Sequence, residues 1–470
     1  MSAPLVWIVL PGLLSAVLLA FQRREALVAF LGTLATLGLA ALAWWLPVQE
    51  RFFIGPWTLT FLDTLSVLGR SFTLGEADRP ALVVLYLTAA FWFGAAPVAR
   101  SGRLFVPLGL GMVVLLTAAI AVEPFLYAAL LIEMAVLVSI PFLISVGKPV
   151  GPGVLRYLTF QTLGMPFILF TGWMLTGVEA SPGELGLVPQ ASILIALGFA
   201  FLLAVFPFYT WIPMLAKESH PYTAAFVFLV LPGTISLLGL GFLDRFSWLR
   251  TSENTYFLLR STGILMVVTA GVWAAFQTHL ERMLAYALIL EIGFSFISIG
   301  LAQGAQAGTY LGIFFAALLP RGLSLGVWAL ALAVIRTRFP VLSFREVQGL
   351  ARVAPIACGS LVLAHFSLAG LPLLAGFPVR LAQLEGLSEI SLLNALWVLL
   401  GSLGLLIGGL RTLAVLVMGR EDGVWQVTET WVQRVFLLSG VASLIILGLV
   451  PQWFLPLLAR LPLAFEQLVP

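Results

Sequence analysis

The stretch FSLAGLPLLAGFPVRL, residues 366–381, decides which fold this chain can adopt. It is hydrophobic, yet it contains two glycines, Gly370 and Gly376, and two prolines, Pro372 and Pro378. Glycine and proline in this number interrupt a helix. Unwound backbone at membrane depth is tolerated only where it is buried in protein or lines a water-filled cavity. The stretch therefore predicts a broken membrane helix beside a functional site.

The composition of the whole chain places it in the membrane. Of its 470 residues, 61% are hydrophobic and 10% are charged, whereas soluble domains carry about 25% charged residues. The single cysteine, Cys358, excludes a disulfide framework and an iron–sulfur centre within this chain. The three histidines are far apart, so no local metal motif exists, and no phosphate-binding or dinucleotide motif occurs. We expect no cofactor, metal, nucleotide or nucleic acid bound to this chain.

About fourteen apolar runs have the roughly 20 residues that a spanning helix needs. We therefore expect an all-α integral membrane protein. Residues 50–79 carry Thr, Gly and charge and are expected to form an extracytoplasmic hairpin within an N-terminal unit, 1–103. The remaining boundaries predicted are 104–243 for helices 4–8, 244–417 for helices 9–13, and 418–470 for a last helix with a surface tail.

The distribution of Lys and Arg predicts the orientation, because cytoplasmic loops are enriched in both. Of the 24 basic residues, fifteen fall in one set of alternate loops, seven in the other, and two inside apolar runs. This ratio predicts an even helix count with both termini outside the cytoplasm. We expect a multi-pass protein of a bacterial-type inner or other energy-transducing membrane.

Five ionisable residues lie inside apolar runs: Glu133, Glu291, Arg321, His365 and Arg380. A charged side chain at bilayer depth costs at least about 2.5 kcal/mol on insertion scales, so such residues usually face a bundle interior. They are the candidate proton pathway.

Four of the five also have a specific structural explanation. Glu133 could form a structural ion pair, and His365 could be a neutral core histidine. Arg321 follows Pro320 and could satisfy carbonyls freed by the proline. Arg380 could pair with Glu385 near the surface.

A second interruption lies about 165 residues before the first. The stretch FPFYTWIPMLAKESHP, residues 206–221, contains Pro207 and Pro213. Interrupted helices at matching positions of two halves indicate a transport site between repeats, and the interval fits two five-helix repeats. Four charged or titratable residues near helix ends are peripheral candidates: Lys217, His220, His279 and Arg282.

Three stretches together resemble the antiporter-like membrane subunits of respiratory complex I, of multisubunit cation/proton antiporters and of membrane-bound hydrogenases. These are residues 206–221, residues 366–381, and ERMLAYALILEIGFSFISIGLA at 281–302. The resemblance covers roughly residues 100–420. It implies fourteen helices with two inverted five-helix repeats, broken helices 7 and 12, a polar axis at the membrane midplane, and proton translocation within a larger redox-driven complex.

The resemblance also implies which residues carry protons. Glu133 matches the family's glutamate on helix 5, whereas Leu202 occupies the position of its lysine on helix 7. Glu291 stands at a histidine position, and Arg321 and Arg380 stand at lysine positions. Because arginine stays charged at accessible pH, we expect Glu133, Glu291 and His365 to exchange protons and the arginines to act as fixed charges.

Several functions remain open at this point. The first is a proton-translocating subunit of a complex such as NADH:quinone oxidoreductase, with no catalytic or redox centre of its own. The second is a non-pumping structural membrane subunit, which Leu202 favours. The third is a membrane partner in an inorganic-carbon uptake or cation/proton antiporter complex, and an independent small-solute transporter is a weaker fourth. In the first three, the partners are other membrane subunits and the lipid bilayer.

Overall fold

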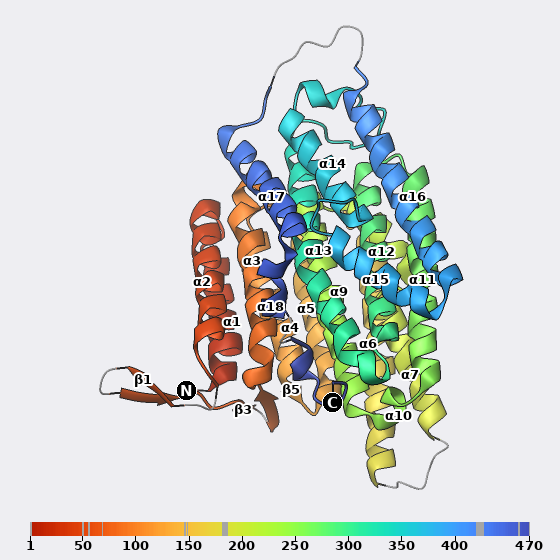
Figure 1. Ribbon diagram of the computed structural model, residues 1–470. Coiled ribbons are helices and arrows are strands. Elements are labelled where there is room, and N and C mark those ends of the chain that lie inside the picture. Colours follow the sequence, from red (N-terminus) through yellow and green to blue (C-terminus); the bar gives the residue numbers. More distant parts are fainter. Residues whose placement is uncertain are drawn as a thin grey trace.

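The structure is a computed structural model that describes residues 2–48, 51–54, 57–67, 69–144, 147, 149–180, 187–419, 427–458 and 461–469. Long helices lie side by side in one bundle and account for most of the described chain (Figure 1). The expectation of an all-helical membrane fold is confirmed by this architecture. Short strands occur only at one end of the bundle among the described residues.

The first half of the bundle runs from the N-terminus to α10. Its helices are α1 (Leu10–Ala20), α2 (Glu25–Trp45), α3 (Arg79–Ala99), α4 (Phe105–Ala121), α5 (Ala128–Leu143), α6 (Pro152–Ala180), α7 (Leu187–Leu202), α8 (Trp211–Glu218), α9 (Pro221–Arg245) and α10 (Ser247–Arg250). A π-helical turn, Leu5–Val9, precedes α1.

The second half continues from α11 to the C-terminus. Its helices are α11 (Glu253–Phe276), α12 (Leu280–Leu301), α13 (Ala307–Arg336), α14 (Pro355–Ala369), α15 (Phe377–Ile390), α16 (Leu392–Val417), α17 (Trp431–Leu449) and α18 (Leu455–Leu458). Several begin with side-chain caps; Ser391, for example, accepts a hydrogen bond from the Asn394 amide at the start of α16.

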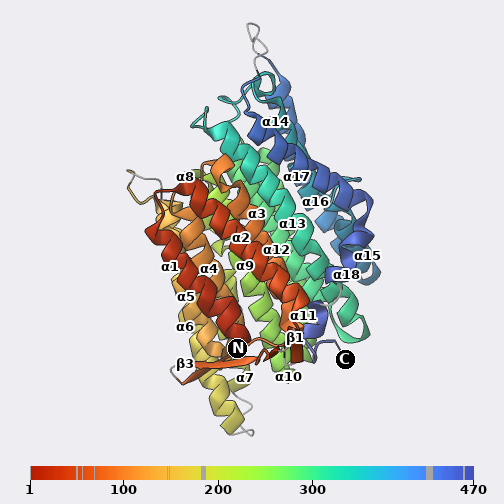
Figure 2. The ribbon, with the colours of Figure 1, turned by 90° about the vertical axis from the view of Figure 1, so that its left-hand side faces the viewer.

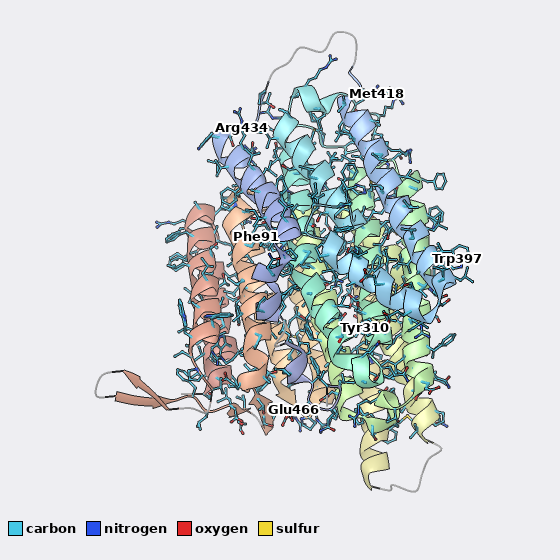
Figure 3. The ribbon with its side chains drawn as sticks, in the orientation of Figure 1. Phe91, Tyr310, Trp397, Met418, Arg434 and Glu466 are labelled. Atoms are coloured by element: carbon cyan, nitrogen blue, oxygen red, sulfur yellow. The ribbon has the colours of Figure 1, made fainter. Side chains whose placement is uncertain are left out.

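Nine of the described helices are long and apolar enough to cross a membrane, and five shorter apolar helices of 10–17 residues accompany them. Their outward faces carry large apolar side chains, such as Trp397 on α16, which is 47% exposed and points away from the bundle (Figure 3). A surface of this kind is stable in lipid and not in water.

The strands lie between α2 and α3 and at the end of α4. β1 (Arg51–Ile54) pairs antiparallel with β2 (Trp57–Thr60). β3 (Thr64–Val67) pairs with β4 (Arg70–Thr73), and β4 also pairs with β5 (Val122–Glu123). These strands and both marked chain ends lie at one end of the bundle, and α8 and the loop before α14 lie at the other (Figure 2).

α12 is the centre of the second half. It is buried along its whole length and packs against α8, α9, α11, α13, α14, α15 and α16. On one side α11 packs against both α12 and α16, and glycines bring the backbones of α11 and α16 together. A Cβ on Gly271 of α11 would overlap the carbonyl oxygen of Gly401 of α16. Only glycine permits this approach.

Two interruptions divide otherwise continuous spans. α14 ends at Gly370 in the left-handed conformation, with φ of 81°, and α15 begins after Gly376. Pro372 lies in the connecting segment and Pro378 in the first turn of α15, where its missing N–H costs nothing. The broken helix predicted at residues 366–381 is therefore present.

The other interruption separates α7 from α8. Pro207 lies within it, and Ala204 has a positive φ of 52°. Pro213 does not break the chain: it lies in the first turn of α8, where the first four N–H groups have no intrahelical acceptor. Pro320 likewise does not end a helix, because α13 continues through it. The expectation that these two prolines break helices was wrong.

Candidate functional site

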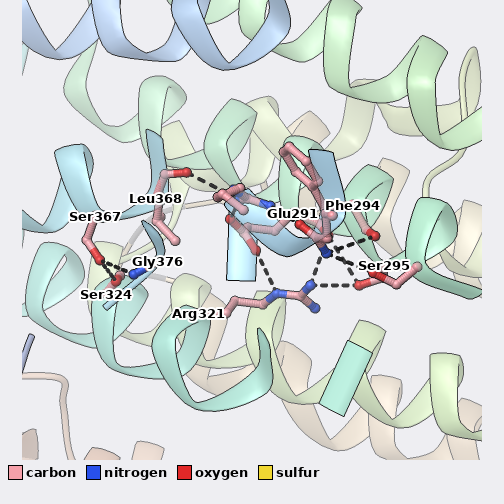
Figure 4. Close-up of polar contacts among 11 residues, drawn as sticks. Glu291, Phe294, Ser295, Arg321, Ser324, Ser367, Leu368 and Gly376 are labelled. Carbon is pink, nitrogen blue, oxygen red and sulfur yellow. Dashed lines mark hydrogen bonds and ion pairs between the residues drawn. The ribbon is translucent and has the colours of Figure 1, made fainter. Parts of the chain in front are cut away.

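Three of the five predicted intramembrane residues meet at one buried site. Glu291 of α12 accepts a hydrogen bond from Arg321 of α13, with 3.0 Å between Oε2 and Nε. Its other carboxylate oxygen, Oε1, accepts one from Arg380 Nη2 of α15. The three side chains are 3–6% exposed. Figure 4 shows Glu291 and Arg321 facing one another across the helices. The alternative in which Arg380 pairs with Glu385 is replaced by this pairing.

Further polar groups surround this three-residue cluster. Arg321 Nη2 donates to the Glu291 carbonyl oxygen at 3.0 Å and to Ser295 Oγ at 2.7 Å. Arg380 Nη1 donates to Gln383 Oε1 at 3.3 Å, and its Cζ lies 3.4 Å from the centre of the Phe294 ring. The contact to Glu291 is therefore one of several that orient each guanidinium group.

The broken helix supplies one of the partners of Arg380. The Leu368 carbonyl oxygen, in the last turn of α14, accepts a hydrogen bond from Arg380 Nη2 at 3.2 Å. Ser367 Oγ accepts bonds from Ser324 Oγ at 2.9 Å and from the Gly376 amide at 3.3 Å. The interruption thus places a freed carbonyl beside Arg380, whose guanidinium group also contacts the Glu291 carboxylate.

The charges of the cluster do not cancel. Two guanidinium groups contact one carboxylate, and no second carboxylate contacts them within the part of the chain that the structure describes. The cluster therefore carries one net positive charge when Glu291 is ionised. Arg380 Nε has no hydrogen-bond partner and is buried. A buried charge without full compensation is costly, which is typical of functional rather than structural positions.

His365 lies outside this cluster. Its Nε2 is 2.8 Å from the Leu405 carbonyl oxygen of α16, and its ring stacks on Trp328 with centroids 4.3 Å apart. Its Nδ1 is buried without a partner. The imidazole is fully buried, and its stacking partner Trp328 lies on α13, the helix that also carries Arg321.

Glu133 lies in the other half of the bundle. It is half-buried on α5 and accepts a hydrogen bond from Thr162 Oγ1 of α6 at 2.7 Å. Its second oxygen, Oε2, is buried without a partner, and no cation pairs with it within the described residues. Leu202, at the end of α7, is 2% exposed, and its carbonyl oxygen accepts a hydrogen bond from Gln161 at 3.1 Å. The structure thus gives no support to a structural ion pair at Glu133.

The peripheral candidates lie at the ends of helices. Burial, followed by the nearby Arg336 guanidinium, lowers the pKa of His220 to about 4, so this residue is neutral at pH 7. Burial also lowers the pKa of His279, and the charges of Lys217 and Arg282 add to this effect. Lys217 and His279 line one cavity. None of the four contacts the cluster.

Sequence reasoning missed the polar residues that orient the cluster. Ser295 follows Glu291 by one helical turn, and Gln383 follows Arg380 by three residues, so both spacings place them on the same helix face. Gln383 in turn donates to Ser298 Oγ at 2.8 Å. Within the described residues, no group of three or more His, Cys, Asp or Glu side chains is arranged to hold a metal ion.

Comparison with known proteins agrees with this architecture. Residues 184–408 match the sequence profile of the family described as NADH:quinone oxidoreductase/Mrp antiporter, TM. The NADH-quinone oxidoreductase subunit N of Laribacter hongkongensis is 26% identical over 463 residues, covering 91% of this chain and 89% of that protein. The subunit of the same name from Thiobacillus denitrificans is 27% identical over 259 residues, and that match spans about half of either protein, 50% of this chain and 51% of the relative.

Two solved structures share the fold over almost the whole chain. A chain of the Mrp complex from Dietzia sp. superposes with a TM-score of 0.83 at 16% identity, covering 100% of this chain and 99% of that one. A chain of respiratory complex I from Thermus thermophilus superposes with a TM-score of 0.77 at 22% identity, covering 99% of each. At these identities the likeness concerns the fold.

Proposed function

Since the chain belongs to the superfamily of antiporter-like membrane subunits found in respiratory complex I and the Mrp antiporters, we propose that it translocates protons as one membrane subunit of a redox-driven complex. The complex is of the NADH:quinone oxidoreductase kind, after the names of the relatives. In this proposal the chain binds no cofactor, and electrons move in partner subunits.

One observation carries the proposal: the buried cluster of Glu291, Arg321 and Arg380 beside the interrupted helix. A purely structural ion pair has one cation for each anion, because a buried charge without a partner is strongly destabilising. This cluster instead holds an excess positive charge at the point where the backbone is unwound. Both features are costly for stability, and both are useful for moving a charge.

The chemistry follows from the contacts. When a proton reaches the Glu291 carboxylate, the cluster loses its only negative charge and two guanidinium groups face each other. This state is stabilised if Arg380 moves away from Glu291. Arg380 lies on α15, directly after the glycine-bounded interruption at Gly370 and Gly376, so a shift of α15 can separate the pair without moving α14. Protonation of Glu291 and movement of α15 are therefore coupled.

Glu133 is the second proton-exchanging group in this proposal, and His365 the third. Glu133 keeps a carboxylate oxygen without a partner, and no cation among the described residues pairs with it, so a proton can bind without breaking an ion pair there. The buried Nδ1 of His365 is free to take or give a proton. Arg321 and Arg380 remain charged and determine the electrostatic potential at Glu291.

The test uses the assembled complex in proteoliposomes and measures protons moved per electron pair. We expect Glu291→Gln and Glu133→Gln to lower that ratio while electron transfer in the uncoupled complex stays intact. Thr162→Val, which removes only the hydrogen bond to Glu133, serves as a matched control and should have the smaller effect. An unchanged ratio in both glutamine variants, with normal assembly, refutes the proposal.

A second candidate, a structural subunit that does not pump, is favoured by one observation. Leu202 is buried where a lysine would be expected, so Glu133 lacks the partner that the family uses. The same proton measurement separates the two functions. Membership of an inorganic-carbon uptake or cation/proton antiporter complex instead would be revealed by the subunits that co-purify with the chain.

The finer topology is part of the proposal. We propose fourteen spans, made of the nine long helices, the five shorter apolar ones and the α8 and α15 half-helices that complete the interrupted spans. Helices 4–8 (104–243) and 9–13 (244–417) would form the two inverted repeats. Both termini would lie outside the cytoplasm, as the basic loop residues favour, in an inner or other energy-transducing membrane.

A further inference from the structure

A cavity of about 340 Å³ lies between the two halves of the chain. Four segments line it: the loop between α5 and α6, the end of α8, the start of α12, and the chain after α13. These elements meet at the end of the bundle opposite the chain termini (Figure 2). The cavity has room for several water molecules, each of which occupies about 30 Å³ in liquid water.

Five ionisable side chains line this cavity: Lys217, Glu218, His279, Glu281 and Arg336. With a neutral His279, the two cations and two carboxylates balance. The cavity lies between the two halves and at one end of the bundle, a location that suits an exchange of protons with water.

The two carboxylates of the cavity differ in their contacts. Glu218 Oε2 accepts a hydrogen bond from the Gly153 amide at 2.7 Å and so fixes the start of α6. Glu281 is 4% exposed and lies 3.6 Å from Arg336 Nη1, which is longer than a hydrogen bond. Arg336 Nη1 itself donates to the Ser219 carbonyl oxygen at 2.6 Å. Of the two cavity carboxylates, Glu281 therefore has the longer contact with its nearest donor.

Four charged or titratable groups face Glu281 from the surrounding elements. They are Arg336 of α13, Lys217 of α8, and Arg282 and His279 from the start of α12 and the residue before it. The cations favour the ionised carboxylate, and its burial favours the protonated one. These opposing effects suit a group that both takes and releases a proton.

Glu281 and Glu291 lie on the same helix. They are ten residues apart on α12, which corresponds to about 15 Å along the axis. Tyr286 lies between them, and its ring is 6.4 Å from that of Tyr209, in the interruption between α7 and α8. The buried helix α12 thus joins the cavity to the Glu291 cluster and passes the other interruption on the way.

We propose that this cavity takes up protons from the aqueous side and that Glu281 is its proton acceptor. A hydronium ion in the cavity transfers its proton to a Glu281 oxygen and leaves as water. The role of this proton in transport rests on the function proposed above, whereas its binding to Glu281 does not.

The first test is infrared difference spectroscopy of the intact complex during a pH jump. We expect a protonated-carboxyl band that disappears in Glu281→Gln, persists in Glu218→Gln and Glu291→Gln, and shifts in Glu281→Asp. A titrating band that is unaffected by Glu281→Gln, in an assembled complex, overturns the inference. This readout does not depend on transport, so its failure is distinct from failure of the proposed function.

The second test measures transport. Glu281→Gln should slow proton translocation several-fold and flatten its dependence on pH, and Glu281→Asp should restore most of both. Normal rates and an unchanged pH profile in Glu281→Gln overturn the inference, provided that Glu291→Gln does reduce translocation in the same preparation. If neither variant has an effect, the proposed function fails, and the infrared result alone decides the cavity's role.

A third variant covers the case in which Glu281→Gln fails to fold. Val341 lines the cavity and is 52% exposed, and the native Cys358 is 3% exposed, so a Val341→Cys thiol is the accessible one within this chain, and labelling of the unmodified complex gives the background. We expect a bulky water-soluble thiol reagent to slow proton translocation in this variant. The control is Met418→Cys, at the same end of the bundle but outside the cavity (Figure 3). Equal effects of labelling at the two positions, or none at Val341→Cys, overturn the inference.

Discussion

Arg321 holds Glu291 at two points. Its Nε donates to the carboxylate oxygen Oε2 and its Nη2 to the carbonyl oxygen of the same residue, both at 3.0 Å. The side chain of α13 is thereby locked to both the side chain and the backbone of α12. Arg380 contacts Glu291 only through the carboxylate. The two arginines are therefore unequal: Arg321 is bonded to both the side chain and the backbone of Glu291, and Arg380 to its carboxylate alone.

The charge balance of the cluster predicts an order of stability among its variants. Glu291→Gln leaves two buried guanidinium groups unpaired and should lower the free energy of unfolding by about 3–5 kcal/mol. Arg380→Gln leaves one balanced pair and should cost clearly less. Thermal unfolding of the complex in nanodiscs would measure both. A larger loss in Arg380→Gln than in Glu291→Gln would contradict this account of the charges.

Ser295→Ala tests the second hydrogen bond of Arg321. The serine hydroxyl accepts from Nη2 at 2.7 Å, and a hydrogen bond to a charged group contributes about 1.5–3 kcal/mol. We expect a loss in that range by chemical unfolding. Ser298→Ala, which removes a bond to the neutral Gln383 instead, is the matched control and should cost about 1 kcal/mol. Equal losses would show that the charge on Arg321 adds nothing.

Gly271→Ala should separate α11 from α16. The added Cβ would overlap the Gly401 carbonyl oxygen, and backbone on both sides leaves no room for adjustment. We expect loss of the assembled complex or a clearly lower unfolding temperature. Gly359→Ala in α14 is the control, because nothing lies within 4 Å of its Cβ position. Alanine there should stabilise the helix by up to about 1 kcal/mol. Unaltered stability of Gly271→Ala would mean that these helices are not in close contact.

The lowered pKa of His220 predicts a specific dependence of stability on pH. Its pKa in the folded chain is about 4, below the ordinary value of 6.5, so the unfolded chain binds more protons between those values. Lowering the pH from 6.5 to 4 should therefore reduce the free energy of unfolding, by up to about 3 kcal/mol at 1.36 kcal/mol per pH unit. Below pH 4 this contribution is constant. Unfolding temperatures measured across that range should fall less steeply in His220→Gln, and an unchanged slope would assign the effect to other groups.

Much of the architecture could be predicted from local sequence. The excess of apolar residues is sufficient to require a membrane, and Gly370 with Pro372 is sufficient to interrupt a helix. These properties depend on residues within one turn or one span, so they do not require knowledge of tertiary contacts. The limits of this reasoning appear at Pro213 and Pro320. Both lie inside helices: Pro213 is in the first turn of α8, where its N–H would have no intrahelical acceptor, and Pro320 is in the interior of α13, which continues through it.

The site residues could be identified from the sequence, but their contacts could not. The sequence alone determined that Glu133, Glu291, Arg321, His365 and Arg380 lie within apolar segments, since the apolar character of a segment depends only on neighbours in the chain. Only the tertiary structure decided that three of them form one cluster. Glu291 meets Arg321 and Arg380 across 30 and 89 residues, and such contacts depend on how the helices pack. Among the described residues, the same packing leaves Glu133 without a cation and places Arg336 beside Glu281.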